Sequence, residues 1–292
     1  MKVFWYILIV IVFSTSCGRK HNDSLPELDK LLVAIDKEQV DRIKGIINLN
    51  RNLVNHADSD YMKVPLIRAI ANRKMKSVEV LLSLGANPNI RNSQGVTPQI
   101  MAILDKKNGW STRNDKKFLE VLLRAGANPN DTCFLDLDDA ISFFSPESSM
   151  LMLALNHDQE KAKLLLNYGA DINYRTPNNM SAAIEALINE RLDIASFIIV
   201  DNHAEIGIPF YYRDLLNDSI IDYSEPHYAV ELLLEMTYDL DSDEFKKKSQ
   251  IINEFKRQGI NYDSYKDSLN SRIMYRIKKL YPNNWRDYLK SY

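Results

Sequence analysis

Gly85-Ala86-Asn87-Pro88-Asn89 is a five-residue sequence motif, here called the phrase, that occurs three times in this chain. It returns as Gly126-Ala127-Asn128-Pro129-Asn130 and as Gly169-Ala170-Asp171-Ile172-Asn173, each time directly after an apolar run of helical character. Glycine can adopt the left-handed backbone conformation that ends a helix, because it has no Cβ. Asn and Asp can bond their own backbone and begin a turn. The phrase therefore predicts that a helix ends and the chain turns back sharply.

The spacing of the copies predicts a repeat protein. Gly85 and Gly126 are 41 residues apart, and Gly126 and Gly169 are 43 apart. Degenerate copies lie 34 residues after Gly169, at residues 203–206, and 34 residues before Gly85, at residues 51–55. A period near 33 residues, built from a turn and two helices, resembles the ankyrin repeat, with insertions of roughly ten residues in two copies.

Further residues carry the same resemblance over residues 26–206, and more weakly over residues 207–238. Thr97-Pro98 and Val64-Pro65-Leu66 stand where ankyrin repeats have Thr-Pro-Leu-His. Gly95, two residues before Thr97, matches the loop between repeats that is called the finger in this family. The His of that tetrapeptide is missing, and Arg68, Met101 and Ile184 stand at or near its place. We therefore expect fewer side-chain hydrogen bonds between neighbouring turns than in consensus ankyrin repeats.

The resemblance implies an all-α, ankyrin-like helix-turn-helix solenoid of about five to six repeats with a C-terminal helical cap. Apolar residues at spacings of three and four support this, because they mark one buried face of a helix. They predict helix pairs at residues 27–38 and 40–49, 65–71 and 75–84, 98–104 and 114–125, 149–156 and 159–168, 181–189 and 192–200, and a degenerate pair at 211–220 and 226–236.

The chain divides into four expected segments: a signal peptide at 1–16, a lipid-anchored tether at 17–25, the repeat domain at 26–238 and the helical cap at 239–292. In the cap, Asp241 and Glu244 have the spacing of a helix start. That helix is expected to run to Gln258, and a second one to end before Pro282.

The N-terminus has the pattern of an export signal. Lys2 precedes eleven apolar residues at 3–13, a run too short to cross a membrane as a helix. Cys17 then follows small residues, as in the lipobox of bacterial lipoproteins, although Ser14 stands where Leu is usual. This resemblance implies lipidation of Cys17 and a place in the bacterial envelope. The alternative is an ordinary secretory signal with a coincidental Cys.

Gly18 follows the Cys in place of the acidic residue associated with retention in the inner membrane. This favours the outer membrane, on either its periplasmic or its surface face. If Cys17 carries lipid, Cys133 is the remaining thiol. It is interpreted as a small buried hydrophobe or, alternatively, as a reactive thiol, for which no His or Lys stands nearby in sequence.

Composition and motifs exclude several classes of function. The formal net charge of −2 argues against a dedicated nucleic-acid binder, which would have a concentrated basic surplus. The chain lacks a phosphate loop, a dinucleotide fingerprint and the Gly-x-Ser-x-Gly and His-Glu-x-x-His motifs. Its five His residues are scattered without metal-ligand spacing. We therefore predict no enzyme, no metal and no cofactor.

The resemblance implies binding of a protein partner, whose identity stays open, on a concave face of finger tips and inner helices. Aromatic residues and Arg are common at the centres of such interfaces. A polar finger tip can, however, simply be solvated. Carried over to this chain, the candidate contact residues are Tyr61, Arg91, Gln94, Asp136, Asp138, Tyr174, Arg175 and Asn179.

Three functions remain open. The leading one is a non-enzymatic protein-binding scaffold anchored by lipid in a bacterial envelope. Similar exported ankyrin-like proteins imply one specific form, an immunity-type inhibitor of a delivered toxin. The second is an enzyme or a receptor for a small ligand or metal, with a site built by the 131–144 insert. There, Asp136, Asp138 and Asp139 would converge with His157 or Cys133. The third is a purely structural envelope protein.

Overall fold

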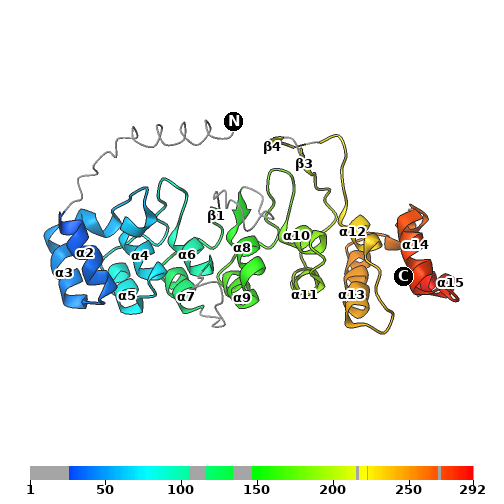
Figure 1. The fold of residues 1–292 in the computed structure, drawn as a ribbon, viewed down its shortest axis with the longest axis horizontal. Coiled ribbons are helices and arrows are strands. Elements are labelled where there is room, and N and C mark those ends of the chain that lie inside the picture. Colours follow the sequence, from blue (N-terminus) through cyan, green and yellow to red (C-terminus); the bar gives the residue numbers. More distant parts are fainter. Residues whose placement is uncertain are drawn as a thin grey trace, which may run out of the picture.

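The computed structural model describes residues 26–104, 116–133, 147–214, 217–221, 223–268 and 271–291. Helices dominate these residues and form a long row of antiparallel pairs, with α2 and α3 at one end and α14 and α15 at the other (Figure 1). Loops and short hairpins, the fingers of the repeats, rise along one side of the row. The predictions for Cys17, Asp136 and Asp138 lie outside the described residues.

The first five predicted helix pairs are confirmed, with ends that differ by a few residues. Prolines stand at the first position of α4 and α6, where the missing N–H costs no helical hydrogen bond. Ser149 and Ser181 cap α8 and α10 by accepting hydrogen bonds from Met152 and Ile184. The pairs are α2 (Pro26–Asp36) with α3 (Val40–Leu49), α4 (Pro65–Ala71) with α5 (Met75–Ser83), α6 (Pro98–Leu104) with α7 (Lys117–Arg124), α8 (Met150–His157) with α9 (Gln159–Asn167), and α10 (Ala182–Ile188) with α11 (Leu192–Ser196).

One apolar core runs through the described part of the stack. The first helices of successive pairs, α2, α4, α6, α8 and α10, pack against one another as an inner row. Many apolar side chains of these inner helices and of the outer helices are fully buried, as at Ile35, Leu81 and Leu153. Burying one such side chain contributes about 1.5–3 kcal/mol. The stack is therefore held mainly by contacts within a pair and between adjacent pairs.

The sixth pair differs from the prediction. The described part of residues 211–220 contains no helix: β3 (Arg213–Asp214) pairs there with the antiparallel strand β4 (Asn217–Ile221). The predicted helix is wrong although the apolar residues of this stretch have helical spacing, because a short hairpin pairs its backbone groups in place of helical hydrogen bonds. The sixth pair consists of α12 (Ala229–Glu235) and α13 (Asp243–Arg257), which pack against α10 and α11 respectively. This pair crosses residues 238 and 239, where we expected the repeat domain to end and the helical cap to begin.

The C-terminal segments pack against this last pair. They are the 3-10 helix η4 (Tyr262–Ser268), α14 (Ser271–Leu280) and α15 (Trp285–Ser291). The Tyr288 hydroxyl donates a hydrogen bond of 2.7 Å to the C=O of Tyr238, and its ring stacks on Tyr281 with centroids 4.2 Å apart. The start of α13 is capped by Ser242, one residue later than expected, through a hydrogen bond from the N–H of Phe245.

The repeated glycines end their helices in the predicted way. Gly85, Gly126 and Gly169 have φ angles of +93°, +90° and +89°. The alanine after each of them donates a backbone hydrogen bond to the C=O five residues back in the helix. His203 takes the same place in the degenerate copy, with φ +56°. Gly259, with φ +82°, ends α13 in the same way, so residues 259–261 form a further copy of the phrase.

The last Asn of the phrase joins each repeat to the next. Asn55, Asn89 and Asn130 donate from Nδ2 to the C=O of Gly85, Gly126 and Gly169, at 3.0 Å in each case. Their Oδ1 atoms accept from the N–H two residues further on, at 2.7, 2.7 and 2.6 Å. Asn173 repeats the second bond, to the N–H of Glu205 at 2.8 Å. We call these four residues, Asn55, Asn89, Asn130 and Asn173, the asparagine ladder.

Arg68 supplies another connection, one residue beyond the position where ankyrin repeats carry the His of Thr-Pro-Leu-His. Its guanidinium bonds the Asp36 carboxylate at the end of α2, with Nη2 and Oδ2 2.6 Å apart. That hydrogen bond lowers the pKa of Asp36, so the pair stays ionised. The absence of His therefore does not leave neighbouring repeats unconnected, because Arg68 and the ladder join them.

We call the pair of hydrogen bonds made by one ladder Asn a rung. Replacing Asn89 with Ala removes both hydrogen bonds of its rung. Since each bond contributes about 0.5–1.5 kcal/mol, we expect the free energy of unfolding to fall by about 1–3 kcal/mol in urea. The matched control is Ser93→Ala, at an exposed polar position of the same finger, which should change it by less than about 0.5 kcal/mol. Equal losses for both variants would contradict the role of the ladder.

A lysine is buried between α13 and the C-terminal segments. Lys248 is fully buried and donates from Nζ to the C=O of Met236 at 2.7 Å, with the Tyr262 ring centroid 5.8 Å away. Burial lowers the pKa of Lys248 to about 6, and the nearby charge of Lys266 acts in the same direction. The folded chain therefore holds this side chain neutral at pH 7.

This lowered pKa predicts a pH-dependent stability. Between about pH 6 and pH 10 the unfolded chain binds a proton at Lys248 that the folded chain does not, so stability rises with pH. In Lys248→Met this contribution is absent. From about pH 6 to pH 9, we expect wild type to gain up to about 4 kcal/mol in free energy of unfolding relative to the variant. Parallel pH profiles of the two proteins would contradict the assignment.

Candidate partner-binding surface

The six predicted contact residues in the described fingers fall into two groups. Tyr61, 39% exposed, and Gln94 lie on fingers with accessible side chains, as a contact residue needs. Arg91, Tyr174, Arg175 and Asn179 are only partly exposed. The structure shows that each of these four makes intramolecular contacts.

Arg91 and Arg175 occupy the same position of two fingers and connect each one to the next. Arg91 donates to the C=O of Gly95 in its own finger, and to Asp131 Oδ1 at 2.6 Å in the following one. Arg175 donates to the C=O of Asn179 and, at 3.0 Å, to the C=O of Glu205. Both guanidinium groups therefore hold neighbouring fingers together.

The remaining two residues also support the fingers. The Tyr174 hydroxyl donates to the C=O of Glu147 at 2.8 Å, and burial raises the pKa of Tyr174. Asn179 has φ +60° and takes the place that Gly95 has in its finger. Asn tolerates this left-handed conformation better than most residues. Its presence is explained by the turn itself.

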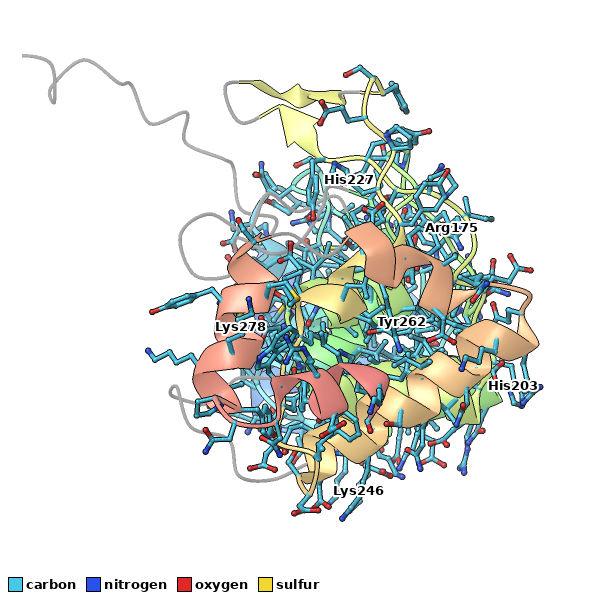
Figure 2. The ribbon with its side chains drawn as sticks, turned by 90° about the vertical axis from the view of Figure 1, so that its right-hand side faces the viewer. Arg175, His203, His227, Lys246, Tyr262 and Lys278 are labelled. Atoms are coloured by element: carbon cyan, nitrogen blue, oxygen red, sulfur yellow. The ribbon has the colours of Figure 1, made fainter. Side chains whose placement is uncertain are left out.

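An aromatic cluster, formed by Phe210, Tyr211, Tyr212, Tyr223 and His227, stands on the finger side of the sixth repeat. Phe210 and His227 exchange two backbone hydrogen bonds of 2.9 and 3.0 Å. This bridge brings together side chains that are far apart in the sequence. Viewed along the stack from its C-terminal end, His227 lies on the same side as Arg175, far from Lys246 on α13 (Figure 2).

The cluster combines a buried base with exposed rings. Phe210 is buried, and Tyr212 packs edge-on against both Phe210 and His227, with centroids 5.5 and 4.7 Å apart. Tyr223 packs against Tyr211 at 4.9 Å and donates to the C=O of Pro177. Tyr212 and Tyr223 nevertheless remain 43% and 59% exposed. Large aromatic rings that are fixed by packing and still accessible are suited to contact with another protein.

Sequence reasoning missed this cluster because it placed residues 211–220 in a helix. The available signal was the run Phe210-Tyr211-Tyr212, whose side chains cannot all face one buried side. Burial raises the pKa of Tyr212, and the charges of Glu235 and Glu231 add to this effect. The exposed ring therefore carries a neutral hydroxyl at physiological pH.

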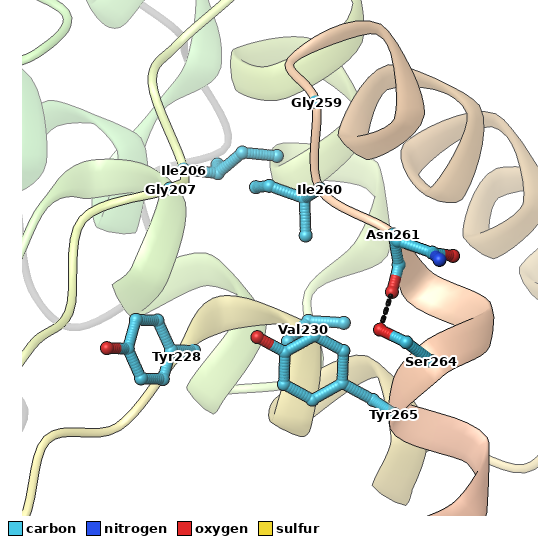
Figure 3. Close-up of a pocket in the computed structure, with 9 residues that line it drawn as sticks. All are labelled: Ile206, Gly207, Tyr228, Val230, Gly259, Ile260, Asn261, Ser264 and Tyr265. Carbon is cyan, nitrogen blue, oxygen red and sulfur yellow. Dashed lines mark hydrogen bonds between the residues drawn. The ribbon is translucent and has the colours of Figure 1, made fainter.

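A cleft of about 270 Å³ lies next to the cluster along the chain. Three parts of the chain surround it: the finger that begins at Ile206, the first turn of α12, and the segment that follows α13 (Figure 3). The rings of Tyr228 and Tyr265 lie on one side, and Ile206 and Ile260 on another. The lining residues are uncharged: Ile206, Gly207, Tyr228, Val230, Gly259, Ile260, Asn261, Ser264 and Tyr265.

The buried ionisable group of the inner helices has a structural partner. Glu185 on α10 accepts a hydrogen bond of 2.8 Å from Asn156 on α8, and Arg191 donates to the same Asn. Burial raises the pKa of Glu185 to about 7. Perturbed carboxylates can mark catalytic sites. Here the contacts of Glu185 connect adjacent repeats.

Groups that would serve the alternative functions are not assembled in the described residues. Within these ranges, no three His, Cys, Asp or Glu side chains converge as a metal site would need. None of the helices found there has the length and apolarity to cross a membrane. Cys133 is buried, as predicted for a small hydrophobe. Asp136, Asp138 and Asp139 lie outside the described residues, so the site expected at the 131–144 insert stays a prediction.

A sequence model of the ankyrin repeat matches residues 63–93, which contain α4, α5 and the phrase at Gly85. A comparison with curated proteins gave no significant match. The match and the helix pairs together identify the fold as an all-α, ankyrin-like solenoid. Ankyrin repeats generally mediate contacts between proteins, and nucleic-acid binding is not indicated.

Proposed function

We propose that this chain is a non-enzymatic scaffold that binds a partner protein on the face formed by its fingers and inner helices. The observation that carries the proposal is the aromatic cluster. Tyr212 and Tyr223 are exposed, yet the backbone bridge between Phe210 and His227 holds their base in place. Preorganised aromatic side chains lose little conformational entropy on binding and provide large contact areas.

The neighbouring surface supports the same site. Ile208 is exposed next to the cluster, and the uncharged cleft begins at Ile206 and Gly207. An apolar centre of this kind, surrounded by polar residues, is typical of a protein interface. Tyr61 and Gln94 extend the accessible residues to earlier fingers. We place the centre of binding at the sixth repeat.

The test is affinity capture from envelope extracts with the full chain, followed by mass spectrometry. We expect Tyr212→Ala with Tyr223→Ala to weaken recovery of the specific partner at least about tenfold, because hot-spot truncations cost about 2 kcal/mol or more. The matched control is Tyr275→Ala, which removes an equally large tyrosine, 67% exposed on α14. A thermal unfolding curve for each variant separates loss of contact from loss of fold.

If no specific partner is recovered, or if both variants lose it equally, the proposed surface is wrong. A captured enzyme whose activity falls on binding would identify the scaffold as an immunity-type inhibitor, the specific form that the sequence resemblance implies. A partner that keeps its activity in the complex would exclude that form.

We further propose that the scaffold is anchored by lipid at Cys17 to the bacterial cell envelope, at the outer membrane. Lys2, the apolar run at 3–13 and the small residues before Cys17 support this, and Gly18 supports the outer membrane. In cells given a radiolabelled fatty acid, wild type should take up label and sediment with outer membranes. Cys17→Ser should do neither. Label in Cys17→Ser, or none in wild type, would overturn the anchor.

A further inference from the structure

The asparagine ladder stops at the cleft. Three of its residues, Asn89, Asn130 and Asn173, stand four positions after the glycine that ends an outer helix. After His203 the same position is Gly207, which has no side chain to make a rung. The next copy of the phrase begins at Gly259. The groups that a rung would bond there are the C=O of Gly259 and the N–H of Asn261.

The backbone groups that would bond a ladder Asn at this junction are present in the structure. The backbone around Gly259 repeats the hydrogen bonds and the positive φ found at Gly85, Gly126 and Gly169. Within the described part of the chain, no hydrogen bond engages the C=O of Gly259 or the N–H of Asn261. Both residues line the cleft together with Gly207 (Figure 3).

A carboxamide from the opposite side, that of Gln258, links the two segments. Gln258 donates from Nε2 to the C=O of Ala204 at 2.9 Å, and its Oε1 accepts from the N–H of Ile206 at 3.2 Å. These two bonds join the fifth junction through Ala204 and Ile206, and do not use the C=O of Gly259 or the N–H of Asn261. The residue in the place of the ladder Asn, Gly207, and the residues that carry the two backbone groups, Gly259 and Asn261, therefore line one cleft.

We infer that this cleft binds the carboxamide of an Asn or Gln side chain of the partner protein, which completes the ladder. The inference rests on the proposed scaffold function. At three junctions of this chain, a carboxamide already bonds the equivalent C=O and N–H at 2.6–3.0 Å. The receiving geometry for this chemical group is thus built three times in the same molecule.

The cleft suits a side chain within a protein better than a free amino acid. Its lining residues carry no charge, so the ammonium and carboxylate groups of free asparagine would find no partner there. Its volume of about 270 Å³ lies just below the range of about 300–1,000 Å³ common for small-molecule sites. Val230, Ile206 and Ile260 can cover the aliphatic part of the side chain, and the aromatic cluster lies next to these residues along the chain.

The test uses blocked amino acids and the full chain labelled with ¹⁵N-glycine. The chain has nine glycines, so its spectrum is simple. N-acetyl-asparagine methylamide and its glutamine analogue are the probes. N-acetyl-leucine methylamide, similar in shape to the Asn probe, and free asparagine are the controls. We expect a probe to shift the Gly207 and Gly259 signals saturably and to bind about tenfold more tightly than the controls.

Internal controls come from the filled rungs. The signals of Gly85, Gly126 and Gly169 should not move, because Asn55, Asn89 and Asn130 already occupy those sites. Gly207→Asn should supply the missing carboxamide from within the chain and reduce probe binding at least about tenfold. Gly207→Ala should retain binding, since its Cβ would meet only Ile260 Cδ1, at an ordinary 3.7 Å.

Each contrary result has a defined meaning. Equal binding of the Leu and Asn probes would show an apolar pocket without carboxamide selectivity and overturn the inference. Stronger binding of free asparagine would indicate a small-ligand site in place of a docking site. No response at Gly259, or full binding by Gly207→Asn, would also overturn it. Partner capture that depends on Tyr212 and Tyr223 would still support the scaffold, so the two proposals can fail separately.

Discussion

The asparagine rung is the contact on which the register of the stack depends. One carboxamide bonds two backbone groups of the next repeat, a C=O and an N–H two residues later. Those two groups face the side chain only because a residue in the left-handed conformation ends the outer helix and turns the chain. The helix end of one repeat thus becomes the binding site for the last Asn of the repeat before it. Local conformation and assembly between repeats are specified by the same five residues.

This arrangement explains how the stack tolerates irregular spacing. The rungs need only the phrase itself, so chain inserted elsewhere in a repeat leaves them intact. Copies separated by 41 and 43 residues are joined with the same distances as one separated by 34. In a solenoid each repeat contacts only its neighbours, so an insertion alters one junction at most. The fingers can therefore vary in length above a regular row of helices.

The same division separates structural residues from candidates for binding. Arg91 and Arg175 have the chemistry of interface residues, but their guanidinium groups join adjacent fingers. The exposed rings of Tyr212 and Tyr223 lie where the regular pattern changes, at the long finger before α12. The cleft lies at the junction where the ladder loses its Asn. Both features favour the C-terminal part of the stack as the place where this protein meets its partner.

The sequence by itself determined the helix pairs and the solenoid, because apolar spacing and the glycine at a helix end act within a few residues. It predicted residues 65–71 and 98–104 as helices, and the structure has them with the same bounds. The tertiary structure decided what depends on partners distant in the chain. Asn89 needs the backbone of Gly126, Phe210 needs His227, and α13 belongs to the stack because it packs on α11. Such contacts leave no periodic pattern, since their energy depends on where the folded chain places the second partner.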